Sequence, residues 1–449
     1  MHDFVLYLFE LLHSGLSVAA LAVLICGGVL IAVRIRKRGR LPRRKAVLLL
    51  LLAGYLAVVL SVTVLRFSGV SGVNLHLGLA WREAWNKFTL KLWLNIILNI
   101  GLFVPLGILL PLLWPKGRKW YWMLLSGFSL SLAIELMQLF AGNMTDVDDL
   151  LHNTLGAMLG WCAVMLVLEL RAKRPGRAAA CLILPGAVAA VFGGVFLAYE
   201  LQEFGNLEYA PTFRADTSGV EWTIECALTD QNVAPVYRVE PLDRAGADAF
   251  GFDLFARIGR ECPDIYYYDN QTVMGNHSGG PFLDLNWLDR TWSLTAMEVP
   301  ELPDRVDETA LRAELERFGV CVPEGMLFRI DGDTACLEAQ MLSDGGTLYD
   351  GFIRRRVNEW GDYSLEYGLV TAEPIREVEI RTPSQAAREL MDGDFYHGGW
   401  IADVEQVTVT DCRLIYMIDS KGFYQPVYTF TLVSPQQPYP YDAFVPAFF

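Results

Sequence analysis

The stretch T-D-V-D-D-L-L-H-N-T-L-G-A-M-L-G, residues 145–160, opens an otherwise apolar segment that runs to about residue 170. The length and composition of this segment are typical of a helix that crosses a membrane, which needs about 20 apolar residues. Three aspartates nonetheless stand at its start, and His152 and Asn153 follow one turn further on. Acidic and polar residues in such a segment either cap a helix end or form a functional site. Which of these roles they have determines what function the sequence indicates.

Composition divides the chain into two parts. Of its 449 residues 53% are hydrophobic, and these are concentrated in the first 199 positions. Residues 1–199 hold 19 Lys and Arg against 8 Asp and Glu, whereas residues 200–449 hold 18 against 43. We therefore predict a basic membrane domain over 1–199 and an acidic domain over 200–449. Binding to nucleic acid depends on Lys and Arg contacts to phosphates, so the acidic domain argues against a nucleic acid partner.

Hydropathy predicts a polytopic α-helical membrane bundle with six spans, at roughly 14–33, 46–65, 92–113, 121–140, 148–168 and 179–199. The connections at 34–45, 116–119 and 171–177 carry eight, three and four basic residues, and the alternate connections are sparse or acidic. Positive charge favours the cytoplasmic side. We therefore expect a cell membrane protein whose N-terminus and C-terminal domain are both extracytoplasmic.

The acidic half predicts an α+β domain with possible subunits at 200–305, 306–380 and 381–449. Asp307 caps a predicted helix that Gly319 ends, and Thr382, Pro383 and Gln385 begin a second helix that Gly393 ends. Strands are expected after the first helix at 326–330, 335–341 and 348–357, and after the second at 404–410, 411–418 and 423–433. The run D-I-Y-Y-Y-D-N at 264–270 has two interpretations, a glycan-stacking surface and an ordinary core strand.

Cysteines form neither a disulfide framework nor a zinc motif. Cys26, Cys162 and Cys181 lie in predicted spans, where buried cysteine behaves as a small apolar residue. Five more lie in the acidic half, where an odd number allows at most two disulfides. These five are Cys226, Cys262, Cys321, Cys336 and Cys412.

Polar side chains in three predicted spans fall at one depth. Counting from the outer end of each span at about 1.5 Å per residue places Asn99, Glu135 and Asn153 at roughly 8–10 Å below the outer surface. Helix spacing puts Gln138 on the face of Glu135, and Asp149 on the face of Asn153. Gly156 and Gly160 form a G-x-x-x-G on that last face, which we expect to pack against the span at 121–140.

Each of these residues also has an ordinary structural explanation. Asp146 and Asp149 fit helix capping, and Asn153 could simply bond Asn99 across helices. Glu135 is harder to explain in this way, because a carboxylate within a span is costly and has no Lys or Arg at its depth. We expect its partner to be Gln138, Asn99, Asn153, a water or a cation. His152 is expected on a different face, toward the headgroups.

The runs N-I-I-L-N-I-G-L-F-V-P-L-G, S-L-S-L-A-I-E-L-M-Q-L-F and D-V-D-D-L-L-H-N-T-L-G-A-M-L-G resemble, in order and spacing, the three motif blocks of the VanZ-like family of bacterial membrane proteins. The resemblance covers roughly residues 50–168. It implies an envelope role linked to low-level resistance to the glycopeptide teicoplanin, without an assigned reaction. The family positions carried over are Asn99, Pro105, Gly107, Glu135, Gln138, Asp146, Asp149, Asn153 and Gly156.

Two departures from that family pattern stand out. Asn143 occupies a position where the family usually has Arg, and N-L-H-L-G at 74–78 replaces the usual N-L-x-P-F. Arg82 or Arg66 could supply the missing charge. In the acidic half, the helix-then-sheet plan and the strand Q-P-V-Y-T-F at 425–430 weakly resemble PepSY-like and YycI-like modules of Gram-positive bacteria, which implies a domain that binds other proteins.

Three functions follow as alternatives. In the first, an outer-leaflet polar site binds or modifies an envelope lipid or a lipid-linked cell-wall precursor, with Glu135 as candidate catalytic residue. That site comprises Asn99, Glu135, Gln138, Asp146, Asp148, Asp149 and Asn153. Asp146, Asp149 and Glu135 are candidate ligands of a divalent cation, since carboxylates suit hard cations. In the second, the bundle is a scaffold whose outer domain binds a protein or cell-wall partner. In the third, the bundle transports a small solute.

Overall fold

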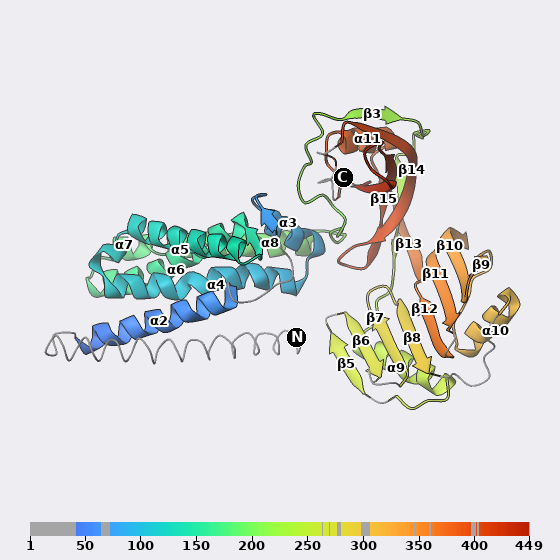
Figure 1. Cartoon of the computed structure of the whole chain (residues 1–449), viewed down its shortest axis with the longest axis horizontal. Helices are drawn as coiled ribbons and strands as arrows, with labels where there is room; N and C mark the ends of the chain where they lie inside the picture. The colour runs from blue at the N-terminus through green and yellow to red at the C-terminus, as the bar shows by residue number, and fades with distance from the viewer. Residues whose placement is uncertain are drawn as a thin grey trace. The chain divides into compact units, whose positions relative to one another are not determined.

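The computed structural model describes residues 42–63, 72–262, 264–268, 270–275, 280–297, 306–344, 346–358, 361–396, 401 and 404–448 (Figure 1). The chain forms two compact units that divide between Glu203 and Phe204. The described residues up to Glu203 are the helical unit. Those from Phe204 onward are the β-rich unit. This division lies four residues beyond the predicted one at 199/200.

Helices in the helical unit follow the predicted spans closely, although the predicted span at 14–33 and Arg66 lie outside the described residues. Five described stretches are long and apolar enough to cross a membrane: α2 (Arg43–Thr63), α4 (Leu90–Leu113), α5 (Trp120–Phe140), α6 (Val147–Arg171) and Pro175–Leu201. The last of these comprises α7 (Pro175–Ala180) and α8 (Ile183–Leu201). Smaller elements complete the unit: β1 (Gly72–Asn74), α3 (Leu79–Lys87), η1 (Pro115–Arg118) and β2 (Met144–Asp146).

Helix α6 lies closest to α4, because its glycines leave room for the α4 backbone. A Cβ atom on Gly156 would lie 1.9 Å from the carbonyl oxygen of Ile100, and one on Gly160 would lie 2.1 Å from that of Val104. The predicted close approach at small residues is confirmed, but its predicted partner is wrong, since the glycines meet α4 rather than α5. A short connection makes two helices neighbours without fixing which face each presents.

Strands β1 and β2 pair in parallel just before α6, with Asn74 opposite Asp146. These short elements and α3 were not predicted, because each has too few residues to produce a clear hydrophobic period. Together they bring residues 72–80 against the first turn of α6. They therefore shape the end of the bundle at which the polar residues gather.

One continuous sheet of fourteen strands runs through the described β-rich unit, in the order β3-β14-β15-β4-β13-β11-β12-β8-β7-β6-β5, with β9, β10 and β16 attached beside it. The strands are β3 (Glu221–Ile224), β4 (Val233–Arg238), β5 (Ile265–Tyr268), β6 (Gln271–Gly275), β7 (Phe282–Asn286), β8 (Trp292–Met297), β9 (Leu327–Asp331), β10 (Thr334–Asp344), β11 (Thr347–Val357), β12 (Asp362–Tyr367), β13 (Val370–Glu379), β14 (Gln406–Ile418), β15 (Phe423–Val433) and β16 (Tyr441–Pro446). Three helices accompany them: α9 (Arg244–Arg257), α10 (Glu308–Arg317) and α11 (Pro383–Met391).

Two main apolar cores lie along this sheet. The first packs α9 and α10 against β6–β12, around residues such as Leu254, Leu311 and Leu365. The second packs α11 against β3, β4 and β13–β16, around residues such as Phe395 and Phe430. Strands β3 and β4 come from the earliest part of the unit yet pair with β14 and β13. The three sequence segments proposed as subunits are therefore interleaved.

The predicted helix ends of the β-rich unit are confirmed. The Asp307 side chain accepts a hydrogen bond from the backbone N–H of Ala310, and Thr382 with Gln385 forms a capping box. Gly319 and Gly393 adopt positive φ angles of 79° and 86° just after their helices. The strands predicted at 404–410 and 411–418 form one strand, β14, because a register shift between Val409 and Asp411 absorbs the break in alternation.

Candidate functional site

The acidic start of α6 is tied to the end of α5 through Glu135. The Asp146 side chain caps α6 by accepting a hydrogen bond from the backbone N–H of Asp148 at 2.8 Å. The Asp146 backbone N–H in turn donates to the Glu135 carboxylate at 3.0 Å. Glu135 is only 5% exposed. Its partner is therefore a backbone amide, which the sequence analysis did not include among the expected partners.

Asn99 and Asn153 each bond to a different helix. The Asn99 amide donates to the Asp149 carboxylate, joining α4 to α6. The Asn153 amide donates to the Ser131 hydroxyl at 3.0 Å, joining α6 to α5. The expected Asn153–Asn99 pair is wrong. Ser131 lies four residues before Glu135, so helix spacing would have placed it on the same face.

Asp148 serves the neighbouring short helix. Its carboxylate oxygens accept from the backbone N–H groups of Gly78 and Ala80, at 2.6 and 2.9 Å, at the start of α3. The side chain is fully buried. Two free N–H groups at a helix start favour a carboxylate. Asp148 thus fixes α3 against α6.

His152 and Gln138 also contact helices or loops inside the unit. The Trp81 indole N–H donates to His152 Nε2 at 2.8 Å, and His152 is 1% exposed. The expectation that His152 points to headgroups is wrong, because α3 covers it. The Gln138 amide donates to the Thr63 carbonyl oxygen at 3.1 Å, at the end of α2.

Four carboxylates at this end of the bundle, those of Glu135, Asp146, Asp148 and Asp149, accept hydrogen bonds from neutral donors. Among the described residues, no Lys or Arg forms an ion pair with Glu135, Asp146, Asp148 or Asp149. Glu135 accepts a hydrogen bond from the backbone N–H of Asp146, and Asp149 lies in the first turn of the helix that Asp146 caps. We call Asn99, Ser131, Glu135, Asp146, Asp149 and Asn153 the α4–α6 polar cluster. It is a concentration of negative charge without a fixed counter-charge.

Some buried polar atoms around this cluster have no hydrogen-bond partner among the described residues. They are Asn153 Oδ1, Gln138 Oε1 and His152 Nδ1. A buried polar atom without a partner costs about 1–3 kcal/mol, so such atoms favour a water or ligand beside them. Two of the three are acceptors. The surroundings therefore suit a group that donates hydrogen bonds.

The candidate cation ligands Glu135, Asp146 and Asp149 are not gathered around one point among the described residues. Within the described residues, no three His, Cys, Asp or Glu side chains converge on a point where a metal ion could bind. Asp146 and Asp149 use carboxylate oxygens for the α6 cap and for Asn99. The arrangement is better suited to accepting hydrogen bonds or holding a proton than to enclosing a hard cation.

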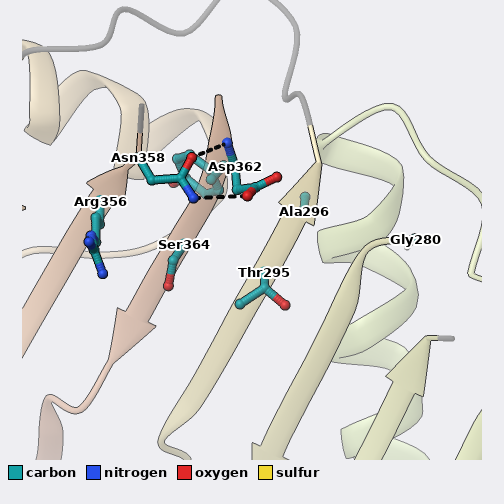
Figure 2. A pocket seen from close by; sticks show the side chains of 8 residues that line it. Gly280, Thr295, Ala296, Arg356, Asn358, Asp362 and Ser364 are labelled. Atoms are coloured by element: carbon teal, nitrogen blue, oxygen red, sulfur yellow. Dashed lines mark hydrogen bonds between the residues drawn. The ribbon is translucent and has the colours of Figure 1, made fainter. Parts of the chain in front are cut away.

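The β-rich unit contributes an open hollow on its sheet, shown in Figure 2. Its volume is about 390 Å³, and its lining includes Thr295, Arg356, Asn358 and Asp362. Three of these groups already bond to protein: Asn358 donates to the Asp362 carboxylate at 2.8 Å, and Arg356 pairs with Asp333.

The tyrosine run of the β-rich unit forms β5, the last strand in the sheet order. Tyr266 and Tyr268 are 49% and 40% exposed. Tyr267 points the other way, where its hydroxyl donates to the Asp248 carboxylate at 2.9 Å. The run therefore exposes Tyr266 and Tyr268 at the surface and packs Tyr267 against the protein.

The arrangement of the helical unit agrees with a family match. Residues 45–168 match the family model VanZ/LLP1. This segment is VanZ-like. All positions carried over from the family motifs lie within it, including Glu135 and Asn153. At the position of the usual family Arg, Asn143 is 5% exposed and its backbone N–H closes the turn after α5 on the Gln138 carbonyl oxygen.

Other comparisons add little to the VanZ-like match. A search of the curated proteins found no match. A crystal structure of an uncharacterized protein from Eubacterium rectale ATCC 33656 aligns with 51% of this chain and 88% of its own, at 11% identity and a TM-score of 0.25. The VanZ-like segment and the apolar helices together indicate a multi-pass membrane protein of the cell envelope.

Proposed function

We propose that the α4–α6 polar cluster is a binding site for the polar headgroup of an envelope lipid or a lipid-linked cell-wall precursor. The observation that carries this proposal is the charge of the cluster. Glu135 and Asp149 lie on facing helices, and among the described residues neither is paired with Lys or Arg. Placing uncompensated carboxylates inside an apolar bundle is costly, which favours a function over packing alone.

The proposed location of this site is the outer leaflet. The cluster lies at the end of α5 and the start of α6, whereas the basic connections at 116–119 and 171–177 lie at the opposite ends of these helices. Basic connections favour the cytoplasm. The polar cluster and the β-rich unit would then both be extracytoplasmic.

The chemistry of the cluster selects its ligand. The carboxylate oxygens, the unpartnered Asn153 oxygen and the unpartnered oxygen of nearby Gln138 accept hydrogen bonds, and the negative charge of the carboxylates repels phosphate. A headgroup that presents ammonium or hydroxyl donors fits this pattern. Binding such a group would alter the availability of an envelope component, and this is the route by which we infer a contribution to glycopeptide resistance.

Native mass spectrometry of the solubilised full chain tests this proposal. We expect wild type to retain a lipid with an ammonium- or hydroxyl-bearing headgroup, and Glu135→Gln and Asp149→Asn to lose most of it. Glu169→Gln is the matched control, because Glu169 pairs with Arg174 at 3.8 Å near the other end of α6. Equal lipid retention by wild type and the three variants would show that the cluster only joins helices.

A second candidate function is a membrane-anchored scaffold or regulator. It is favoured by β5, whose exposed Tyr266 and Tyr268 stand on the last strand of the sheet order. Such an edge strand can accept an extended segment of another protein. Tyr266→Ser with Tyr268→Ser would then abolish capture of an envelope protein partner while leaving lipid retention unchanged.

A further inference from the structure

Two cysteines far apart in the sequence lie near one strand pair of the β-rich unit: Cys412 is on β14, and Cys226 is two residues beyond the end of β3. Strand β3 pairs in parallel with β14, with Trp222 opposite Val407 and Ile224 opposite Val409. The pairing continues past the end of β3, since the Glu225 N–H donates to the Val409 carbonyl oxygen at 2.9 Å. Cys226 is the next residue on the β3 side.

A bulge brings Cys412 to the matching position on β14. The register of β14 shifts between Val409 and Asp411, so Thr410 is an extra residue. Without it, alternation would turn Cys412 away from Val407 and Val409. With it, these three side chains share one face. Cys412 therefore follows Val409 as the next residue on this face of β14, and Cys226 lies two residues after Ile224, just past the end of β3.

Packing agrees with this register. Cys226 and Cys412 both pack against the second apolar core, as do Trp222 and Leu414. Neighbouring strands lie about 4.8 Å apart, and disulfides join residues whose Cα atoms are about 4.4–6.8 Å apart. A cysteine on β14 and a cysteine just past the end of its paired strand, both packed against the same core, fit that spacing.

The chemistry of these thiols indicates a structural role. Burial, with a smaller contribution from the neighbouring Cys226, raises the pKa of Cys412 to about 12. Burial also raises the pKa of Cys226. A thiol with a raised pKa holds little thiolate at neutral pH, so neither is suited to catalysis.

We propose that Cys226 and Cys412, which the structure holds as thiols, form a disulfide in the mature protein. The oxidant is the disulfide of a thiol–disulfide oxidoreductase, acting while the segment is still unfolded. One cysteine thiolate attacks that disulfide and releases one oxidoreductase thiolate. The second cysteine thiolate attacks the mixed disulfide at the first cysteine's sulfur and releases the other. Two electrons and two protons pass to the oxidoreductase.

The bond would hold in place β3, a short strand that packs against the second core. Strand β3 has four residues, stands at the end of the sheet order, and is held by a single parallel ladder. Joining it to the long strand β14 closes a loop that contains most of the β-rich unit. This inference goes beyond the proposed function but rests on the proposed extracytoplasmic location, where disulfides persist.

Disulfide mapping of the full chain tests the inference. Protein from the host membrane is alkylated with N-ethylmaleimide before any reduction, digested and analysed by mass spectrometry. We expect the peptides of Cys226 and Cys412 as one linked pair that phosphine separates. Cys321 and Cys336 should carry the alkyl group, because among the described residues neither is opposite another cysteine. Recovery of Cys226 and Cys412 as alkylated thiols would overturn the inference.

Labelling of intact cells separates this failure from a failure of the proposed location. Cys321 is exposed and reports the compartment when a membrane-impermeant maleimide is added. Labelled Cys321 with free Cys226 and Cys412 would refute the disulfide alone, whereas unlabelled Cys321 would refute the location as well. If the bond forms, Cys226→Ser, Cys412→Ser and the double variant lower the thermal midpoint equally, and a reductant has no further effect on them. Additive losses would contradict a shared bond.

Discussion

The carboxylate of Glu135, near the end of α5, accepts a hydrogen bond from the backbone N–H of Asp146, the residue that caps α6, at 3.0 Å. This bond gives Glu135 a local structural role beside the proposed binding role. The two roles require different chemistry. The cap needs only an acceptor oxygen, whereas the proposed site needs the negative charge or a proton.

Substitution of Glu135 separates these roles. Glu135→Gln keeps an acceptor oxygen for the Asp146 amide, so we expect its thermal stability to stay within about 1 kcal/mol of wild type. Glu135→Leu leaves that amide without a partner and should cost about 1–3 kcal/mol. Thermal denaturation of the solubilised protein, followed by gel filtration, measures both. Equal loss in the two variants would mean that the charge itself holds the helices together.

Contact between α4 and α6 depends on the absence of a side chain at Gly156. A Cβ there would lie 1.9 Å from the Ile100 carbonyl oxygen, so Gly156→Ala must push the helices apart. We expect a loss of about 1–3 kcal/mol or more, measured by thermal denaturation. Gly101→Ala in α4 is the matched control, because nothing lies within 4 Å of its added Cβ. A stable Gly156→Ala protein would contradict the close packing.

The packing of α3 against α6 depends on Asp148. This residue therefore has a structural role, whereas Asp149 belongs to the proposed binding site. Asp148→Ala removes the acceptor of the Gly78 and Ala80 amides, at a cost of about 1–3 kcal/mol. We expect faster hydrogen exchange at the first turn of α3, measured by mass spectrometry, with the amides of α8 as the internal reference. Unchanged exchange at α3 would show that water replaces the carboxylate without loss.

Stability of the β-rich unit should depend on pH through Asp350. Burial raises the pKa of this carboxyl, although the Met341 backbone N–H opposes the rise. The contribution of Asp350 is complete below its unfolded pKa, about 3.9, and is lost as pH rises through the folded value. Asp350→Asn keeps an acceptor for Met341 and should remove this loss. We therefore expect the variant to gain thermal stability relative to wild type as pH rises from about 4 to 8.

Asp333 provides a control of opposite sign for the pH measurement. Its exposed side chain is bonded by Arg356, which lowers its pKa. The contribution of Asp333 is present above the unfolded pKa and is lost as pH falls through the folded one. Asp333→Asn should therefore differ from wild type mainly at higher pH, with wild type the more stable. If the stability difference from wild type changed with pH in the same way in both variants, the pH dependence would not originate in these two carboxyls.

Local sequence signals predicted the elements of the fold well. Hydropathy placed four of the described spans within a few residues, and Thr382, Gln385 and Asp307 marked helix starts because each cap is a contact within one turn. Pairing across long sequence distances was not predictable in this way. The pairing of β3 with β14 and of β4 with β13 depends on how the whole β-rich unit packs.

The candidate site was predicted in part. Helix spacing brought Asn99, Glu135 and Asn153 to one level, and the structure joins their helices there through Asp146, Asp149 and Ser131. The individual partners could not be predicted, because a side chain's partner depends on how each helix is rotated. The roles of Asp148 and His152 were missed for another reason. Their partners lie on α3, which has too few residues to be recognised from its period.

If the Glu135 carboxylate acts within a functional site, susceptibility to teicoplanin and vancomycin should depend on it. A sensitive Gram-positive host would express wild type, Glu135→Gln or Glu169→Gln, with equal membrane levels confirmed by blot. We expect wild type and Glu169→Gln to raise the inhibitory concentration of teicoplanin and Glu135→Gln not to raise it. Equal protection by Glu135→Gln would exclude a functional carboxylate at this position and leave Glu135 with its structural role alone.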